Sequence, residues 1–346
     1  MKTQILKINR NAIDLQLIKR AAKVLRGGGL VAFPTETVYG LGANALDAKA
    51  VAKIFKAKGR PSDNPIIVHV SNLKQLRDIV KGIPQSAKPL MRRYWPGPLT
   101  LIFRKAQKVP DEVTAGLPTV AVRMPSHPVA LALIDEAGVP VAAPSANLSG
   151  RPSPTTAEHV IEDLNGRVEV IIDSGSTDIG VESTVLDITK SPFTILRPGG
   201  VSLESLSQHT QVRLHPKLKD MEMEADEIPE SPGMKYRHYA PKAKLIVLKG
   251  AKEKISNAIK ELVHQFRLQG LRVGVLAPFS GRYGANVTIT CDGDKLRFAN
   301  ILFKALRKFD EEQVDIILVA GVKAAGIGRA IMNRLEKAAV YKVIEL

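Results

Sequence analysis

The stretch LVAFPTETVYGLG, residues 30–42, gives the clearest indication of the fold. Its apolar start, residues 30–33, follows three glycines and is ended by Pro34, as expected of a short buried strand. Polar residues follow, together with Gly40 and Gly42. Ligand sites in α/β domains gather where such strands end. Residues 34–42 are therefore predicted to form a loop that closes around a small polar ligand. A polar turn in which glycine supplies only backbone freedom is the alternative.

The residues on either side of this stretch predict a mixed α/β domain that ends near residue 210. Apolar residues at helical spacing predict helices at residues 10–26, 48–57, 72–80, 127–137 and 155–164. Asp47 is expected to cap the second of these helices. Short apolar runs predict strands at residues 65–70, 99–103, 120–124, 139–143, 168–172, 183–188 and 194–196.

The remainder of the chain divides into a linker and a second domain. Residues 211–243 contain an acidic run at 220–227 and then prolines and glycine, without apolar periodicity, which is typical of a linker. In residues 244–346, strands at 245–248, 271–276, 286–289, 314–319 and 340–345 are interleaved with helices at 251–268, 296–309 and 325–338. This alternation favours a mostly parallel sheet with helical cover. The sequence therefore predicts domains at 1–210 and 244–346.

The charge of the chain points to an anionic partner. The net charge is +16, and residues 1–100 hold 18 basic but only five acidic residues. Such a basic half suits a polynucleotide or a phosphorylated small molecule, although a solvated basic surface is the simpler alternative. The aromatic content of 5% is low for a surface that stacks bases.

Several classes of protein are excluded or disfavoured. Cys291 is the single cysteine, so an internal disulfide is impossible and a zinc ligand set is lacking. No apolar run approaches the roughly 20 residues that span a bilayer, and the N-terminus lacks a signal-peptide core, so the expectation is a protein that is neither exported nor bound to a membrane. A Walker-type GxxxxGK[ST] segment is missing. GIGRAI at 326–331 lacks the third glycine of a dinucleotide fingerprint and is interpreted as a tight turn.

Two further loops carry residues suited to phosphate. In KGRPSDNP, residues 58–65, Lys58 and Arg60 leave a helix end and enter a loop that proline and glycine make rigid. Arginine presents a fork to phosphate oxygens and lysine a mobile charge, so a triphosphate clamp is plausible. Cations that balance the helix dipole are the alternative, but this does not explain the rigid loop.

The other loop is PSANLSGRPS, residues 144–153, which follows an apolar strand. Its serine and asparagine oxygens can bind Mg²⁺ or its waters, and its donors can bind phosphate oxygens. Without a GxSxG elbow, Ser145 is not interpreted as a nucleophile. Arg123, Ser183 and Arg197 look like isolated inward-facing groups, which taken singly are more often structural.

Taken together, these blocks resemble the threonylcarbamoyl-AMP synthase family. The matching segments are PTETVYGLG (34–42), KGRP (58–61), NPIIVH (64–69), WPGPLT (95–100), VAVRMP (120–125), PSANLSG (144–150), ESTVLD (182–187) and LRPG (196–199). The family's KxR pair and distant SxN correspond to Lys58, Arg60, Ser145 and Asn147. SPGMKYRHYAP at 231–241 and the α/β pattern after it resemble the long form of the family, which has a second domain.

The resemblance implies a fold, a reaction and a set of site residues. The fold is a YrdC-like, twisted, mostly parallel sheet with a concave positive surface, followed by a small Rossmann-like α/β domain. The reaction joins L-threonine, bicarbonate and ATP, with Mg²⁺, into threonylcarbamoyl-AMP and pyrophosphate in the cytoplasm, and other proteins transfer the group to tRNA. Residues expected to bind threonine are Thr37, His69, Arg123, Ala143 and Ser183. Residues expected to bind ATP are Arg60, Asn64, Thr119, Ser145, Ser153, Arg197 and Tyr236, with Lys58 and Asn147 joining Arg60 and Ser145 in catalysis.

The chemistry of the residues agrees with this reaction. A carbamate oxygen attacks the α-phosphorus, so two anions must meet, and Lys58, Arg60 and Mg²⁺ can neutralise them. Arg123 suits the threonine carboxylate. Tyr236 lies in a cluster of aromatic and basic residues, so residues 231–241 are expected to act as a lid. A double-stranded RNA-binding module is the alternative function. A related domain of hydrogenase maturation factors is a second rival, but the cysteine count excludes the zinc fingers that accompany it.

Overall fold

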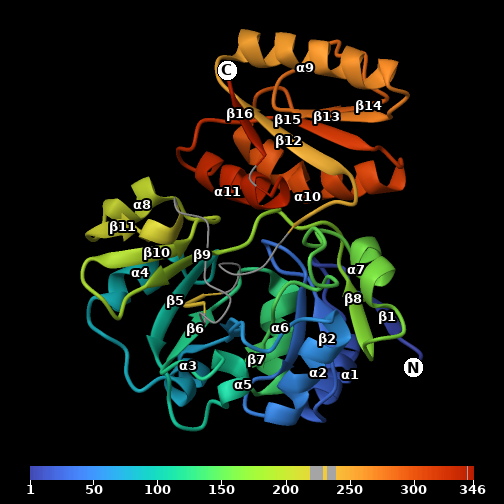
Figure 1. The fold of residues 1–346 in the computed structure, drawn as a ribbon. Helices are drawn as coiled ribbons and strands as arrows, with labels where there is room; N and C mark the ends of the chain where they lie inside the picture. Colours follow the sequence, from blue (N-terminus) through green and yellow to red (C-terminus); the bar gives the residue numbers. More distant parts are fainter. Residues whose placement is uncertain (219–228, 232–238, 341) are drawn as a thin grey trace. The chain divides into compact units, whose positions relative to one another are not determined.

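The computed structural model describes residues 1–218, 229–231, 239–340 and 342–346 (Figure 1). The chain forms two compact units, one of Met1–Ser149 with Ser153–Tyr236 and the other of Gly150–Pro152 with Arg237–Leu346. Each unit has its own sheet. Every helix in the described part of the chain is too short or too polar to cross a membrane.

The described strands of the first unit form one 11-stranded sheet in the order β1-β8-β2-β3-β7-β4-β6-β5-β9-β10-β11. These strands are β1 (Gln4–Lys7), β2 (Val31–Phe33), β3 (Gly40–Asn44), β4 (Val68–His69), β5 (Leu99–Arg104), β6 (Thr119–Arg123), β7 (Val141–Ala142), β8 (Val170–Asp173), β9 (Thr184–Asp187), β10 (Phe193–Arg197) and β11 (Val212–Leu214). Its helices are α1 (Leu15–Arg26), α2 (Ala48–Lys58), α3 (Leu73–Ile79), α4 (Ala87–Tyr94), α5 (Asp111–Thr114), α6 (Pro128–Ala137), α7 (Ala157–Leu164) and α8 (Leu203–Ser207), with a 3-10 turn, η1, at Pro216–Leu218.

Capping residues set the helix ends. Asp14 accepts hydrogen bonds from the backbone N–H groups of Gln16 and Leu17, so α1 begins at Leu15. The predicted start at residue 10 was therefore too early. Asp47 caps α2 as predicted, and Gly59 ends that helix in the left-handed region with φ 61°. The strands β1 and β11 and the helices α4, α5 and α8 were not predicted, because they are short and bury little apolar surface or lie beside prolines.

The predicted ligand loop is shorter than residues 34–42, because Gly40–Asn44 is the strand β3, which pairs antiparallel with β2. A Cβ atom at Gly42 would lie 2.8 Å from the side chains of both Phe33 and Val141. Glycine is therefore needed there for close packing between strands, and not for freedom of a loop.

The first unit's sheet is mixed rather than mostly parallel. Five of its described strand pairs are parallel, and five are antiparallel. Antiparallel neighbours need no crossover helix. Between β2 and β3, for example, the chain reverses with only residues 34–39 in the connection.

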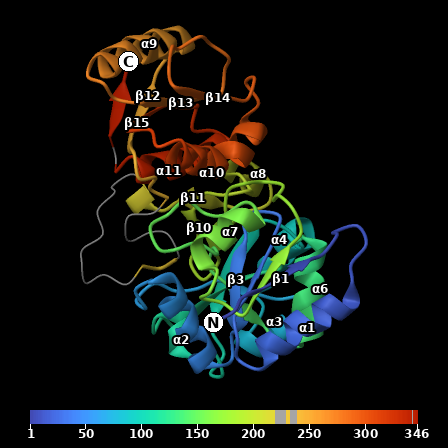
Figure 2. The same cartoon turned by 90° about the vertical axis from the view of Figure 1, so that its right-hand side faces the viewer.

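Helices cover the two faces of this sheet unequally. The larger core lies under α2, α3, α4, α5 and α7. On the opposite face, α1 and α6 lie side by side over β1, β8, β2 and β7 (Figure 2). Further along, a separate small cluster of Ile67, Ile102, Ala121, Val185 and Leu196 lines the strands β6, β5, β9 and β10. The candidate site is built around this small cluster.

The second unit confirms the predicted alternation. In its described residues, five parallel strands run in the order β14-β13-β15-β12-β16. Its elements are β12 (Lys244–Lys249), α9 (Lys252–Leu268), β13 (Val273–Ala277), β14 (Val287–Thr290), α10 (Lys295–Glu311), β15 (Ile316–Ala320), α11 (Gly328–Ala338) and β16 (Val343–Glu345). The segment GIGR forms the tight turn into α11, with Gly326 at φ 58°. Within this unit the buried Arg307 donates to the Pro152 carbonyl (2.7 Å).

Candidate active site

The strand β6 arranges the site in three zones. Because side chains alternate along a strand, Thr119, Ala121 and Arg123 share one face. Across the β5–β6 ladder, Thr100 pairs with Arg123, Ile102 with Ala121 and Arg104 with Thr119. The site thus has a polar zone at Arg123, an apolar middle and a second polar zone at Thr119, about 13 Å away at roughly 3.3 Å per residue.

The first polar zone is built around the buried Arg123. Its Nη1 donates to Thr37 Oγ1 (2.8 Å), and its Nε donates to the Gly97 carbonyl (3.2 Å). Its Nη2 lies 2.6 Å from Glu36 Oε1, and both side chains of this ion pair are almost fully buried. The second Glu36 oxygen accepts from the Ser126 N–H (3.1 Å). The guanidinium is therefore fixed from three sides.

His69 is next to Arg123, because β4 and β6 pair in parallel with these two residues in register. Its ring meets the Phe33 ring edge-on at 6.2 Å. Burial and the nearby positive charge of Arg123 lower the pKa of His69 to about 3, so the imidazole is neutral near pH 7. Its Nδ1 atom is buried without a hydrogen-bond partner. A neutral, partly unsatisfied imidazole suits contact with a polar ligand better than proton transfer.

Three more residues belong to the same zone: Thr100 of β5, Ser183 directly before β9, and Arg197 at the end of β10. Arg197 donates to the Ser183 carbonyl through Nε (3.2 Å) and Nη2 (3.0 Å), and its Nη2 also lies 3.2 Å from Ser183 Oγ. The hydroxyls of Ser183 and Thr100 are hydrogen-bonded at 2.8 Å. Ala143, which is also buried here, donates its N–H to the Ile67 carbonyl (2.9 Å). The structure therefore places all five residues that were predicted to bind threonine at the ends of neighbouring strands or in the 34–39 connection.

Lys58 links the two predicted phosphate loops. Its buried ammonium donates to the carbonyl oxygens of Ser145 and Asn147. In return, the Ser149 N–H donates to the Lys58 carbonyl (2.9 Å). Ser145 Oγ donates to Asn147 Oδ1 (2.6 Å), which places two hard oxygen atoms side by side. The KxR and SxN segments thus form one structure, in which Lys58 holds the loops together.

Other residues that were predicted to bind ATP lie in or next to these loops. Arg60 is half-buried, and its Nη2 donates to the carbonyls of Asn64 (3.3 Å) and Pro65 (3.2 Å). Asn64 is 1% exposed, yet neither its Oδ1 nor its Nδ2 has a hydrogen-bond partner. A buried amide with both ends unsatisfied is costly, so it suits a ligand-binding position. Ser153 Oγ donates to Glu182 Oε1 (2.7 Å).

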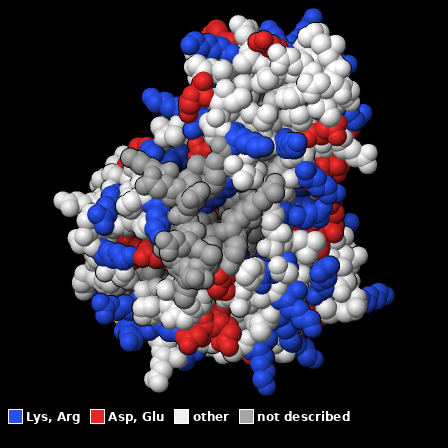
Figure 3. Space-filling model, in the orientation of Figure 1, with Lys and Arg blue, Asp and Glu red and all other residues white. Residues whose placement is uncertain are grey.

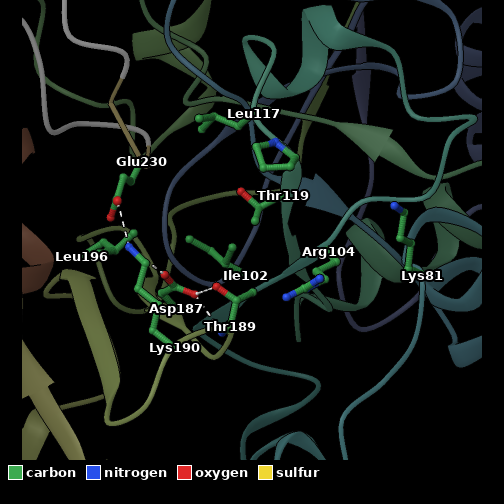
Figure 4. A pocket seen from close by; sticks show the side chains of 11 residues that line it. Lys81, Ile102, Arg104, Leu117, Thr119, Asp187, Thr189, Lys190, Leu196 and Glu230 are labelled. Atoms are coloured by element: carbon green, nitrogen blue, oxygen red, sulfur yellow. Dashed lines mark hydrogen bonds and ion pairs between the residues drawn. The ribbon is translucent and has the colours of Figure 1, made fainter.

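A hollow of about 440 Å³ adjoins the second polar zone (Figure 4). Thr119, Arg104 and Leu196 are among its lining residues. On its rim, Lys190 lies 2.8 Å from Glu230 and 3.5 Å from Asp187. Thr119 joins the site through its strand register with Arg104 and through this hollow, which it lines together with Ile102 and Leu196. Tyr236 lies outside the described residues.

The sequence did not single out three residues that hold this site together: Glu36, Thr100 and Glu182. Glu36 lies within the quoted PTETVYGLG block and Glu182 within ESTVLD. The signal that could have identified them is a carboxylate inside an apolar, glycine-rich block, because buried carboxylates are rare unless they are paired. In the described residues, no group of three or more His, Cys, Asp or Glu side chains could hold a metal ion.

Gly199 is expected to be needed for the position of Ser183. A Cβ atom there would lie 2.3 Å from both the Ser183 carbonyl carbon and the Thr184 nitrogen, so the backbone would have to move. Gly199→Ala is expected to lower stability by about 1–3 kcal/mol and to weaken threonine binding. Thermal unfolding and calorimetric titration with threonine measure both effects. Gly82→Ala is the control, because open space surrounds Gly82; equal behaviour of the two variants would contradict the prediction.

The stability of the first unit is expected to fall as the pH drops from 6.5 toward 4. Unfolded histidine takes up a proton near pH 6.5, whereas the pKa of folded His69 is about 3. The unfolded state therefore binds more protons in this range, and acid favours unfolding by up to about 1.4 kcal/mol per pH unit. His127, with its pKa lowered to about 4 mainly by burial, acts in the same direction. Urea unfolding followed by Trp95 fluorescence should show a flatter dependence of stability on pH in His69→Gln than in the wild-type protein, and an unchanged dependence would contradict the prediction.

Comparison with known proteins defines the class first. Residues 23–199 match the Sua5, YciO and YrdC domain model, described as "Telomere recombination". Residues 201–340 match the model of the threonylcarbamoyl-AMP synthase C-terminal domain. The fold is shared with a crystal structure of Pyrococcus abyssi Sua5 complexed with L-threonine, at TM-score 0.95 and 49% identity over 99% of this chain and 100% of that one. The E. coli YciO structure matches 57% of this chain and 96% of its own, at TM-score 0.53 and 27% identity.

Curated sequences then define the family. The threonylcarbamoyl-AMP synthase of Pyrococcus abyssi is 50% identical over 97% of this chain and 98% of its own. That of Bacillus subtilis is 50% identical over 94% of each chain. The chain belongs to the threonylcarbamoyl-AMP synthase family, as its sequence blocks predicted.

Proposed function

We propose that the chain catalyses the synthesis of threonylcarbamoyl-AMP and pyrophosphate from L-threonine, bicarbonate and ATP. The observation that carries this proposal is that the connection holding Thr37 lies beside the Ser145 loop: the Ala146 N–H donates to the Tyr39 carbonyl (2.8 Å), and Gly40 forms a β-bridge with Ser145. The zone of Arg123, Thr37 and Ser183 suits an amino acid, and the joined Lys58 and Ser145 loops suit a triphosphate. The crystal structure of Pyrococcus abyssi Sua5 in complex with L-threonine supports the assignment of the Arg123 zone to an amino acid.

In this proposal the Arg123 zone binds threonine. Remaining N–H donors of the Arg123 guanidinium face the carboxylate, and the hydroxyls of Thr37 and Ser183 recognise the threonine hydroxyl. His69, which is neutral, contacts the substrate without exchanging a proton. Ala143 closes the pocket beside them.

The nucleotide occupies the loops and the apolar middle of the site. Arg60 and Lys58 offset the negative charge of the phosphates, and the unsatisfied Asn64 amide supplies a donor and an acceptor. The cluster of Ile102, Ala121 and Leu196 suits a nucleobase, and Thr119 lies at its far end. Ser153 and Arg197 lie between these regions, and Tyr236 is proposed to approach the nucleotide from the linker.

The reaction needs two bonds to form. The neutral threonine amine first bonds to CO₂ to give a carbamate, with release of a proton; the CO₂ comes from bicarbonate by loss of hydroxide, which that proton converts to water. A carbamate oxygen then bonds to the α-phosphorus while the bond to the β-phosphate oxygen breaks and pyrophosphate leaves. Ser145 Oγ is engaged with Asn147 Oδ1, which suits a binding role better than nucleophilic attack.

A divalent metal ion is proposed to accompany ATP, with Mg²⁺ as the expected ion. Ser145 Oγ and Asn147 Oδ1 are hard oxygen donors that lie 2.6 Å apart, so they fit such an ion or its waters. Because the described residues offer no carboxylate cluster, the phosphates would supply most of its ligands. When bound, the ion would reduce the charge repulsion around the α-phosphorus.

The experiment that tests the proposed function is incorporation of radiolabelled bicarbonate into an adenylate. We expect label to appear in an AMP conjugate only when threonine and ATP are both present, with one pyrophosphate released per label. Label incorporation that ignores threonine would contradict the proposal. The product would serve proteins that transfer the threonylcarbamoyl group to tRNA, and the activity is proposed to be cytoplasmic.

A double-stranded RNA-binding module is not favoured. Where Figure 3 shows described residues, lysine and arginine side chains are interspersed with white surface and with aspartate and glutamate. RNA binding that falls steeply with salt and ignores threonine would revive this alternative.

A further inference from the structure

We propose that Glu36 is the fixed counter-charge of the threonine pocket, which holds Arg123 in place and makes the pocket select a zwitterionic amino acid over a simple carboxylate. This inference rests on the proposed function, because it takes Arg123 to be the group that binds the substrate carboxylate. It assigns Glu36 a positioning and specificity role.

The geometry of Glu36 suits a fixed charge. Oε1 lies 2.6 Å from Arg123 Nη2, and Oε2 accepts from the Ser126 N–H at 3.1 Å. Glu36 is 4% exposed. Because both carboxylate oxygens are held, the group cannot swing toward a substrate as a mobile base would.

The backbone that carries Glu36 is held equally firmly. The Glu36 carbonyl accepts from the N–H groups of Asp178 (3.1 Å) and Ile179 (2.8 Å), and the Thr37 carbonyl accepts from Gly180 (3.1 Å). The Thr35 hydroxyl donates to the Val38 carbonyl (2.6 Å), which closes the turn. Glu36 and Thr37 therefore reach the Arg123 guanidinium from one rigid connection, and each takes a different nitrogen atom of it.

The consequence is electrostatic. A buried arginine by itself would attract any small anion, because its charge would lack compensation. With Glu36 paired, the charge of Arg123 is balanced by one buried negative charge 2.6 Å away. A ligand with one carboxylate and one ammonium leaves the balance unchanged, whereas a carboxylate without an amine adds a net charge to a buried site.

Two reciprocal variants of the full-length protein test this inference. Glu36→Gln keeps the shape but leaves the zone one charge more positive, whereas Arg123→Met leaves it one charge more negative. The probes are threonine, the anion 2,3-dihydroxybutyrate, in which a hydroxyl replaces the amine, and the cation threoninamide. Calorimetric titration gives a dissociation constant for each combination of protein variant and probe, and circular dichroism verifies that each variant is folded.

We expect the wild-type protein to prefer threonine to both probes. Glu36→Gln should weaken threonine binding about tenfold and reduce the preference for threonine over 2,3-dihydroxybutyrate by more than tenfold, a modest effect for one buried charge. Arg123→Met should shift the preference toward threoninamide. Glu36→Asp, which keeps the charge, should retain the zwitterion preference, and the KM for ATP should stay within about twofold in Glu36→Gln. Glu169→Gln is the matched control, because that carboxylate accepts from the Leu30 N–H (2.8 Å) and no ion pair with an arginine is seen for it among the described residues.

The failures are distinguishable. If wild-type protein does not bind threonine, the proposed function fails. If it binds threonine but Glu36→Gln leaves the threonine-to-acid ratio unchanged, or Glu36→Asp changes it as much as Glu36→Gln, then Glu36 is only structural and the inference is overturned. If Glu36→Gln does not fold, the Arg123→Met preference decides, and an unchanged order of the three probes contradicts the inference.

Discussion

Valine should be a substrate about 10⁴-fold poorer than threonine in kcat/KM, although the two side chains have nearly the same shape. Sites that hydrogen-bond a substrate hydroxyl reject analogues without it by this order, because buried polar groups lose a partner. Here the Thr37 hydroxyl accepts a buried hydrogen bond from Arg123, and the Ser183 hydroxyl shares one with Thr100. An apolar methyl in place of the substrate hydroxyl would face this network without satisfying it.

Pyrophosphate release with threonine, serine and valine as competing substrates measures this selectivity. Serine lacks only the methyl group, so it should lose only about 10- to 200-fold. Thr37→Val should narrow the gap between threonine and valine, because it removes one of the two proposed hydroxyl partners. Valine turnover within tenfold of threonine turnover would show that the Arg123 zone does not recognise a hydroxyl.

Arg60→Ala should reduce kcat by about 10²- to 10³-fold while the fold persists, because the loss of one fixed group that stabilises transition-state charge costs this much. The described hydrogen bonds of Arg60 run to carbonyl groups of its own loop, and its side chain is only half-buried. The kcat of Arg60→Lys should lie between those of the wild-type protein and Arg60→Ala, since lysine keeps the charge but lacks the planar guanidinium.

The control for Arg60 is Lys56→Ala, which removes an exposed cation from the end of the same helix. Steady-state pyrophosphate release gives the rates, and Trp95 fluorescence shows whether the first unit is folded. Near-normal turnover in Arg60→Ala, or an equal loss in Lys56→Ala, would remove Arg60 from the phosphate-binding assignment.

The sequence by itself determined the order of elements and the stretches that carry the chemistry. Residues 34–42, 58–65 and 144–153 were identified because polar and glycine-rich residues followed strands or helix ends, and their order matched one family. The caps were readable because they act locally: Asp47 bonds only to N–H groups of its own first turn. The alternation in residues 244–346 was readable for a similar reason, since each long helix has its own periodic apolar face.

Only the tertiary structure decided which groups meet. Glu36 and Arg123 are far apart in the chain, and their ion pair exists because the connection after β2 lies against the end of β6. Lys58 looked like a helix-end cation that could reach a phosphate, but the fold directs its ammonium to the carbonyls of Ser145 and Asn147. Gly40 and Gly42 looked like loop residues but lie in the strand β3, and at Gly42 the side chains of Phe33 and Val141 leave no space for a Cβ atom. Periodicity and capping depend on neighbours along the chain, whereas ion pairs, strand direction and the space around a glycine depend on residues that only folding brings together.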